Sequence, residues 1–511
     1  MDNQRRAFAL CEAVVEECFL TSAERQPKKR VVIVEGPPGS GKSAIAARLW
    51  ASLVTDDRLP EGDVVFTTTS QSQNSNWSAI FDQLAEEGGH GLVRKATIFT
   101  PLTTHQLGRL RRQHGEEFLG DASEWRANLQ LLRDLGVGFP DASRDDQNLV
   151  TIVDEAHSLI NPEHSSGRGQ FGFVTGLGPQ AYHIVRASQL TVFLLDRAQG
   201  YRERENTTVS NMKAWSRELG AGEPEIISLE GAQFRCAGSA EYVTWVESIL
   251  AGNSVPENQV HASAWRHQPA PDAPVNVISF PGTSDAHLTR AAEEAPEYRV
   301  KKPRSVWGFD FQLFDTPADL ESALRTRAKE GNSVRLLSSY SRRWKTREAT
   351  APHDLPASMQ DFCETYIHNG SQRIWSRVWN FVPRGGTDYT AFIRAAPGSK
   401  MAEDPLCEVG CPYAVRGFDY DYVGILWLND LVWRHSGWRV DNASVHESGI
   451  SNAVHRARDE RVANGPAHRE LIKRVAQAYR ILLTRPLRGL YLWIPDDETR
   501  HYVEISLGSE P

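Results

Sequence analysis

The chain of 511 residues is too long for one ordinary hydrophobic core, so we expect at least two domains. A hydrophobic content of 40% and a charged content of 24% are typical of a soluble globular protein. Because the formal net charge is −8, the chain as a whole does not attract polyanions, and any nucleic-acid site must be a local basic patch.

The first predicted elements are a helix over residues 4–20, from apolar side chains at helical spacing, and a buried strand over residues 31–35. The segment GPPGSGKS, residues 36–43, follows the strand and fits the pattern G-x-x-x-x-G-K-[ST]. A helical pattern continues over residues 44–53. Strand, glycine-rich loop and helix are the context in which this pattern binds nucleotide phosphates, so we predict a phosphate-binding loop here.

The chemistry of this loop predicts ATP and Mg²⁺ as cofactors. Glycines let backbone N–H groups surround the phosphates, and the helix N-terminus adds the positive end of its dipole. Lys42 would reach the β- and γ-phosphates, and the Ser43 hydroxyl would bind Mg²⁺. Gln4, on the preceding helix, either contacts the adenine or is a surface residue. The predicted nucleotide-binding residues are Gln4, Gly36, Pro37, Pro38, Gly39, Ser40, Gly41, Lys42 and Ser43.

Two further strands are predicted over residues 63–67 and 95–99. The hydroxyl-rich loop over residues 67–71 either hydrogen-bonds to a nucleic-acid backbone or caps a helix. A basic helical piece around residues 109–114 is better explained as a solvated helix face.

The segment NLVTIVDEAHSL, residues 148–159, predicts a central parallel strand that ends in two acids. Asp154 would hold Mg²⁺ through water, and Glu155 would polarise the attacking water as a general base. The next buried strand, over residues 191–195, ends in the polar segment DRAQ. A polar residue at the end of a strand beside the DEAH strand is where a γ-phosphate sensor sits, and Gln199 is the candidate.

A proline-rich segment marks the predicted boundary between two domains. A strand over residues 224–229 and a helix over residues 240–250 come before a proline-rich segment, so we assign residues 1–255 to the ATP-binding domain and 256–511 to a second domain. Predicted strands alternate with helices there, at residues 275–280, 334–338, 422–427 and 490–494. The second domain is therefore also α/β, and without a second phosphate loop it binds no nucleotide of its own.

Two segments of this domain combine basic and aromatic residues, which suits contact with single-stranded nucleic acid. Residues 342–347 are the better candidate, because the tryptophans of residues 373–379 are better explained as core. Cys407 and Cys411 invite a metal interpretation that is weak without a second cysteine pair.

The six scattered cysteines form no disulfide framework, which indicates a reducing compartment. The opening residues lack a signal pattern, and no apolar run reaches the roughly 18 residues of a membrane helix. We therefore expect a cytoplasmic protein with no membrane partner.

In this order the motifs resemble those of a superfamily-one helicase, and more narrowly those of the Schlafen group-three helicase domain found in many bacterial predicted ATPases. The segments that carry the resemblance are GPPGSGKS (36–43), VDEAH (153–157), FLLDRAQ (193–199), LEGAQFRC (229–236), RLLSSYSRRWK (335–345), EVGCPYAVRGFDYDYVG (408–424) and YRILLTRPLRGLYLWIPD (479–496). The resemblance covers nearly the whole chain. It implies two RecA-like P-loop NTPase domains, each with a parallel central sheet flanked by helices, and one ATP between them.

The resemblance also implies roles for single residues. Lys42, Ser43, Asp154 and Glu155 would form the hydrolytic centre with Gln199 as sensor, and Arg235 and Arg485 would act as arginine fingers. Such arginines are worth about 10³–10⁵ in rate in well-studied phosphoryl-transfer enzymes. Gly417 and Asp421 would couple ATP to the nucleic acid.

The chain departs from the family in two respects. Arg416 stands where the family usually has glutamine, which puts the coupling or strand contact in question. Because about 30 residues precede the phosphate loop, we expect no N-terminal nuclease domain of the kind that several relatives carry.

The sequence thus favours an ATP-dependent helicase or translocase on single-stranded DNA or RNA, in bacterial defence or nucleic-acid surveillance and with an effector such as a nuclease. Two alternatives stay open. One is an ATP-gated nucleic-acid sensor or clamp that recruits an effector without unwinding. The other is a regulatory P-loop ATPase that uses no nucleic acid.

Overall fold

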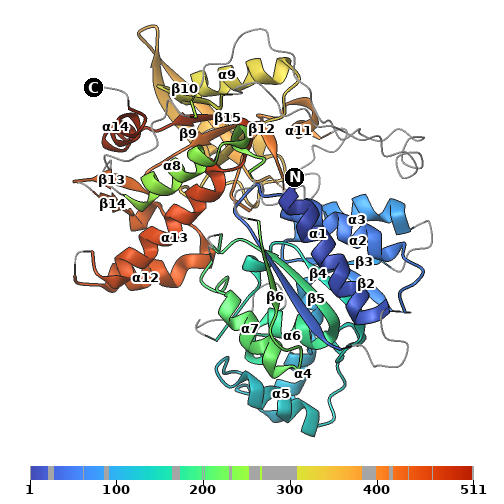
Figure 1. The fold of residues 1–511 in the computed structure, drawn as a ribbon. Coiled ribbons are helices and arrows are strands. Elements are labelled where there is room, and N and C mark those ends of the chain that lie inside the picture. The colour runs from blue at the N-terminus through green and yellow to red at the C-terminus, as the bar shows by residue number, and fades with distance from the viewer. Residues whose placement is uncertain are drawn as a thin grey trace.

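The protein folds into two α/β lobes, shown in Figure 1. The computed structural model describes residues 2–20, 28–60, 62–85, 91–163, 173–197, 199–200, 202–229, 233–252, 265–266, 308–381, 399–413, 418–435, 437–462 and 464–508.

The first lobe is built on a six-stranded sheet in which every neighbouring pair of strands is parallel, in the order β3-β2-β4-β5-β1-β6. The strands are β1 (Arg30–Glu35), β2 (Asp63–Thr68), β3 (Gly91–Lys95), β4 (Asn148–Val153), β5 (Ser188–Leu195) and β6 (Glu225–Ser228). All the residues of β4 are buried, as its unbroken apolar character predicts. Because β5 lies between β1 and β4, the ends of these three strands meet at one edge of the sheet.

Helices cover both faces of this sheet. Helices α1, α2 and α3 pack on one face, and α6 and α7 pack on the other. The helices of the lobe are α1 (Asp2–Val15, continued by a π-helical turn at Glu16–Leu20), α2 (Lys42–Val54), α3 (Gln71–Ala85), α4 (Thr104–His114), α5 (Trp125–Asp134), α6 (Gln180–Ala187) and α7 (Val209–Glu218).

The second lobe has a seven-stranded sheet in the order β7-β15-β12-β8-β11-β10-β9, parallel except for the β9–β10 hairpin. Its strands are β7 (Asp310–Phe314), β8 (Val334–Ser338), β9 (Phe362–His368), β10 (Ser371–Trp379), β11 (Glu408–Gly410), β12 (Tyr420–Leu426) and β15 (Pro486–Trp493), with a separate hairpin of β13 (Val432–Arg434) and β14 (Gly437–Arg439). Its helices are α8 (Ala240–Ala251), α9 (Pro317–Lys329), α11 (Lys400–Glu403), α12 (Ser451–Asp459), α13 (Pro466–Leu483) and α14 (Asp497–Ser506). The expected α/β fold with two parallel sheets flanked by helices is confirmed.

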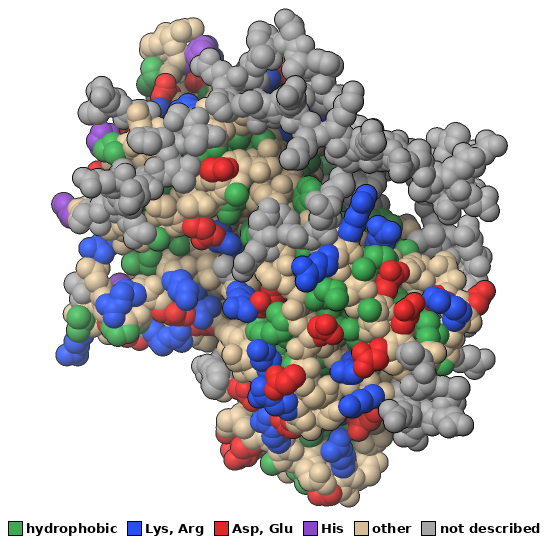
Figure 2. Space-filling model, in the orientation of Figure 1, with side chains coloured by type: hydrophobic (Ala, Val, Ile, Leu, Met, Phe, Trp, Pro, Cys, Tyr) green, Lys and Arg blue, Asp and Glu red, His purple; other side chains and the backbone are tan. Residues whose placement is uncertain are grey.

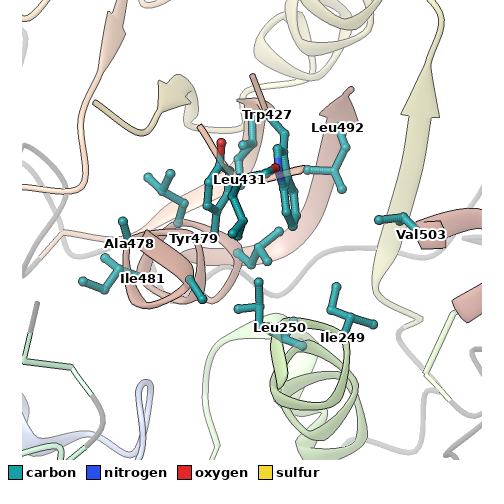
Figure 3. Packing of buried hydrophobic residues seen from close by; sticks show 14 of the residues in the cluster. Ile249, Leu250, Trp427, Leu431, Ala478, Tyr479, Ile481, Leu492 and Val503 are labelled. Atoms are coloured by element: carbon teal, nitrogen blue, oxygen red, sulfur yellow. The ribbon is translucent and has the colours of Figure 1, made fainter. Parts of the chain in front are cut away.

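Helix α8 belongs to the core of the second lobe. Tyr242 Oη donates to the Leu483 carbonyl at 2.9 Å, and Trp245 Nε1 donates to the Ser506 carbonyl at 2.9 Å. Figure 3 shows Ile249 and Leu250 of α8 facing side chains from α13, β15 and the turn after β12. The chain therefore passes to the second lobe before α8, ahead of the division predicted at residue 255, because the apolar face of α8 is buried against this core.

The predicted segments at residues 96–99, 275–280 and 373–379 have different outcomes in the structure. Residues 96–99 form a 3₁₀ turn and not a strand, because Ala96 and Phe99 turn into the core beside α6. The core interpretation of residues 373–379 is confirmed, since Trp375 and Trp379 of β10 are buried. The strand predicted over residues 275–280 lies outside the described residues. In the described part of the chain, no helix is long and apolar enough to cross a membrane.

Candidate nucleotide site

The glycine-rich loop after β1 has the backbone that its sequence predicts. The Gly36 N–H donates to the Leu195 carbonyl at 3.2 Å and so ties the loop to the end of β5. Gly39 and Gly41 have φ angles of 78° and 88°, in the left-handed region where glycine alone is unstrained. Helix α2 begins directly afterwards at Lys42, so its free N–H groups lie at the loop. This is the geometry of an anion site.

Lys42 directly follows the glycines of this loop, as the first residue of α2. Its ammonium donates to the carbonyls of Gly36 and Pro37 at 2.7 and 2.9 Å. Burial lowers the pKa of Lys42, while the carboxylates of Asp196 and Glu155 oppose that shift. A cation held among carbonyl oxygens and facing carboxylates is placed to exchange those carbonyls for phosphate oxygens.

The two acids that end β4 have different surroundings. The Asp154 N–H donates to the Thr67 carbonyl at 3.0 Å, and the Asp154 carboxylate accepts from the Glu155 N–H at 3.0 Å. Burial, and then the charge of Glu155, raises the pKa of Asp154, whereas the Ser43 hydroxyl lowers it. Asp154 and Ser43 therefore lie together, as a shared Mg²⁺ site requires.

Glu155 is oriented by a histidine that the sequence reasoning did not single out. Glu155 has a φ of 55°, and its carboxylate lies 3.0 Å from His157 Nε2. The Asp196 N–H donates to His157 Nδ1 at 3.3 Å, which leaves the ring proton on the Nε2 that faces Glu155. Burial opposes ionisation of Glu155, but His157, Arg485 and Lys42 outweigh burial and lower its pKa. A carboxylate kept ionised suits a general base.

Arg235 and Arg485, the two arginines that the resemblance singles out, lie near Lys42 and Glu155. Arg485, directly before β15, is 1% exposed and close enough to Glu155 to lower the pKa of that acid. Arg235 Nε donates to the Asp419 carboxylate at 2.6 Å, across the two lobes. The Arg235 side chain also lies against the phosphate loop, 3.1 Å from where a Cβ on Gly39 would stand. Lys42, Ser43, Asp154, Glu155, Arg235 and Arg485 thus lie close enough together to interact.

The predicted residue Gln199 lies just after β5. Arg480, a second residue that sequence reasoning missed, contacts the same region from α13. Gln199 is buried, and its N–H donates to the Asp196 carbonyl at 3.3 Å. Arg480, on α13, pairs with Asp196 at 3.3 Å and with Glu247 of α8. The available signal for Arg480 was a charged residue within the otherwise apolar, buried last turns of α13.

Other predicted residues have different placements. Gln4 Nε2 donates to the Ser40 carbonyl at 2.8 Å, so this amide holds the outside of the loop, and contact with adenine stays a prediction. The Asp421 carboxylate accepts from the Ser333 N–H at 2.9 Å at the start of β8, and its coupling role also stays a prediction. Arg416 and Gly417 lie outside the described residues.

The residues present fit ATP and Mg²⁺. Within the described ranges, no three His, Cys, Asp or Glu side chains gather to hold a metal ion by themselves, and this includes the surroundings of Cys407 and Cys411. Mg²⁺ in nucleotide sites is held by one or two protein oxygens together with the phosphates, which is what Ser43 and Asp154 beside the loop provide.

Three known proteins are similar to this chain over much of its length. It is 21% identical over 368 residues, or 69% of its length, to the uncharacterized protein YPL245W of Saccharomyces cerevisiae, and it spans 63% of that protein. Arterivirus nonstructural protein 10, a helicase, is similar at a TM-score of 0.32 and 9% identity, over 93% of this chain and 61% of that one. Saccharomyces cerevisiae Dbp5 bound to RNA and ADP BeF3 is similar at a TM-score of 0.30 and 9% identity, over 100% and 92%.

The family match is extensive, since the sequence model of the Schlafen group 3 DNA/RNA helicase domain matches residues 29–496. That range contains the phosphate loop, the DEAH segment and both arginines of the cleft. By this match, the chain belongs to the Schlafen group 3 DNA/RNA helicase domain family.

Proposed function

We propose that the protein is a Mg²⁺- and ATP-dependent helicase or translocase on single-stranded nucleic acid, with hydrolysis in the cleft between the lobes. The observation that carries the proposal is the position of Arg485, which comes from the second lobe and lies beside Glu155 of the first. A nucleotide held by Lys42 would therefore be complete only when both lobes surround it.

Each residue of the cleft has a chemical task. Bound Mg²⁺ supplies charge neutralisation at the phosphates. Ser43 and Asp154 would hold that ion, and Glu155, kept ionised and oriented by His157, would take the proton of the attacking water. Lys42, Arg235 and Arg485 neutralise the charge that develops on the transferred phosphoryl group. Loss of the γ-phosphate would weaken the contacts of Arg235 and Arg485 and allow the lobes to separate.

The test measures ATP hydrolysis with and without single-stranded DNA or RNA, in the wild type, Lys42→Ala and Glu155→Gln. We expect nucleic acid to stimulate the wild type and both variants to be inactive. Glu155→Gln should still bind ATP, because only the base is lost. A Glu155→Gln variant with near-normal turnover would contradict this mechanism.

A second candidate, an ATP-gated clamp that does not unwind, is favoured by contacts that join the lobes away from the phosphate loop. Arg202, after β5, lies over the ring of Tyr413 at 3.8 Å, and the Glu203 N–H donates to the Gly449 carbonyl at 3.1 Å. Contacts of this kind resist the opening that translocation requires. Strong nucleic-acid stimulation without strand displacement would favour the clamp, and hydrolysis that no nucleic acid stimulates would favour a regulatory ATPase.

From its membership of the Schlafen group 3 family, we also propose that the protein acts in antiviral defence or nucleic-acid surveillance, with a nuclease as partner. Co-purification of a nuclease with the Glu155→Gln variant, in the presence of ATP, is the direct test.

A further inference from the structure

We propose that one surface of the second lobe, formed by Arg458, Arg461, Arg469 and Lys473 and called here the basic face, binds the phosphate backbone of single-stranded nucleic acid. This inference rests on the proposed function and assigns its polyanion to a surface. Figure 2 shows lysine and arginine side chains gathered over the region of α12 and α13 on the side facing the viewer.

The basic face exists because α12 is strongly amphipathic. Ala453, Val454 and Ala457 are buried against the second lobe, so the helix turns its polar side outward. Arg458 on that side is exposed, as are Arg461, Arg469 and Lys473 in the following turn and first turns of α13.

The local charge is opposite in sign to that of the whole chain. Residues 451–474 hold six lysines and arginines against three acids, whereas the full chain holds 57 against 65. The acid Glu460 is engaged within the protein, where it accepts from the His468 N–H at 2.9 Å and pairs with the His468 ring at 2.7 Å. In a protein of net charge −8, this surface is therefore a local positive patch of the kind that polyanions recognise.

The four cations are available for a ligand. The ion pairs of this region use other side chains, namely Arg456 with Glu203, His468 with Glu460 and Arg474 with Glu470. Among the described residues, none of the four forms an ion pair, and only Arg469 has a hydrogen bond, to the Asn464 carbonyl at 2.6 Å. Unpaired surface cations that lie side by side repel one another, and a phosphate backbone relieves that repulsion.

Three residues of the basic–aromatic segment at residues 342–347, which the sequence favoured, are engaged within the protein. Arg342 pairs with Glu364 at 2.6 Å, and the Lys345 ammonium donates to the Gln360 carbonyl at 2.7 Å. The Thr346 N–H donates to the Asp361 carboxylate at 3.0 Å. These contacts leave that segment less free to bind phosphates than the basic face.

Helix α13 connects the basic face to the nucleotide cleft. It begins at Pro466, carries Arg469 and Lys473 in its first two turns and Arg480 in its last turn, and ends two residues before Arg485. Its 18 residues span about 27 Å. A strand bound at one end of this rigid helix and a nucleotide at the other would therefore move with the same element.

The experiment uses the full chain with all four residues changed, Arg458→Gln, Arg461→Gln, Arg469→Gln and Lys473→Gln. Binding of fluorescent single-stranded DNA and RNA is followed by anisotropy at several salt concentrations. We expect affinity to fall at least tenfold near 0.1 M salt, and the slope of log K against log salt to become less negative by about 0.7 for each phosphate that the variant no longer neutralises. ATP hydrolysis without nucleic acid should be unchanged, since none of the four residues lies in the cleft.

The matched control replaces four exposed cations of the first lobe, Arg94, Lys95, Arg109 and Arg112, by glutamine. It makes the same change in net charge and should keep most of the affinity and the salt slope. If the wild type binds nucleic acid and the two variants lose affinity equally, the basic face is not the site, although the proposed function stands. If the wild type itself binds no nucleic acid, both the inference and the nucleic-acid part of the proposed function fail.

Discussion

Buried polar side chains at the carboxyl-terminal edges of the two sheets differ in whether they have hydrogen-bond partners. In the first lobe, Thr67 Oγ1 at the end of β2 and both amide atoms of Gln73 in the next helix are buried with no hydrogen-bond partner among the described residues. In the second lobe, the Asp430 carboxylate accepts from Ser339 Oγ at 2.7 Å and from Tyr479 Oη at 2.6 Å. Buried polar groups are almost always satisfied, so Thr67 and Gln73 keep capacity to bind a ligand, whereas Asp430 is used to hold the structure around it.

The lobes also face each other with opposite ends of their strands. The first lobe presents the ends of β1, β4 and β5, whereas the second presents the starts of β12 and β15, through Asp419 and Arg485. The second lobe therefore brings one cation, Arg485, close to Glu155, whereas the glycine-rich loop belongs entirely to the first lobe. Single substitutions at residues of either lobe can therefore test this difference.

The largest expected effect follows from removing the contribution of the second lobe. Arg485→Ala should lower kcat for ATP hydrolysis by about 10³–10⁵ and change nucleotide affinity little, because an arginine finger acts mainly in the transition state. Steady-state ATPase and nucleotide binding, with circular dichroism to check folding, measure this. Arg500→Ala, on α14, is the control, since Arg500 pairs with Glu504 of the same helix at 2.9 Å. A loss of less than tenfold in Arg485→Ala would show that the lobes do not share the site.

The second prediction concerns Asp430 of the second lobe and the pH dependence of the free energy of unfolding. Burial raises the pKa of Asp430 to about 6 from 3.8. Between about pH 4 and 6 the folded state keeps a proton that the unfolded state releases, so the free energy of unfolding falls as pH rises, by up to about 3 kcal/mol. Asp430→Asn should lack this part of the pH dependence. Urea unfolding at pH 4.5 and 7 measures the difference, and Asp57→Asn, at an exposed site in the first lobe, should keep the wild-type slope.

A smaller effect on nucleotide affinity is expected from a substitution in the glycine-rich loop after β1. Gly39 has a φ of 78°, and an added Cβ would stand 2.0 Å from Gln233 Oε1 and 3.1 Å from Arg235. Gly39→Ala should therefore weaken nucleotide binding about 10- to 100-fold, in line with a strain of 1–3 kcal/mol. Gly136→Ala is the control, because Gly136 has a φ of 64° and open space around it. Both variants should lose a little stability, and equal nucleotide affinity in the two would contradict a tight loop.

Much of the first lobe could be predicted from the sequence because its signals are local. The strands at residues 31–35, 63–67, 149–153 and 191–195 are confirmed, since each is a short apolar run bounded by polar segments. Lys42 and Glu155 could be proposed for the same reason, as loop chemistry follows directly from residue order.

What could not be predicted depends on contacts between distant segments. Helix α8 has an ordinary apolar face, and nothing in its sequence says which sheet will bury it. The same holds for His157 and Arg480, which both contact Asp196 at the distant end of β5. Arg235 and Arg485 were identified only through the family resemblance, because a single arginine carries no local signal of a distant phosphate.

The smallest expected effect tests whether the lobes are coupled through Arg480. Arg480 and Asp196 are 8% and 6% exposed in their side chains and lie 3.3 Å apart across the lobes. A double-mutant cycle of Arg480→Ala and Asp196→Ala, read from urea unfolding, should give a coupling of about 1 kcal/mol. The control cycle uses Arg456 and Glu203, which also join the lobes at 3.1 Å, but Arg456 is 55% exposed, so solvent should reduce the coupling to a few tenths of a kcal/mol. Because the first pair is buried at the ligand-binding edge and the second is open to water, equal couplings would mean that the cleft does not strengthen the ion pair it encloses.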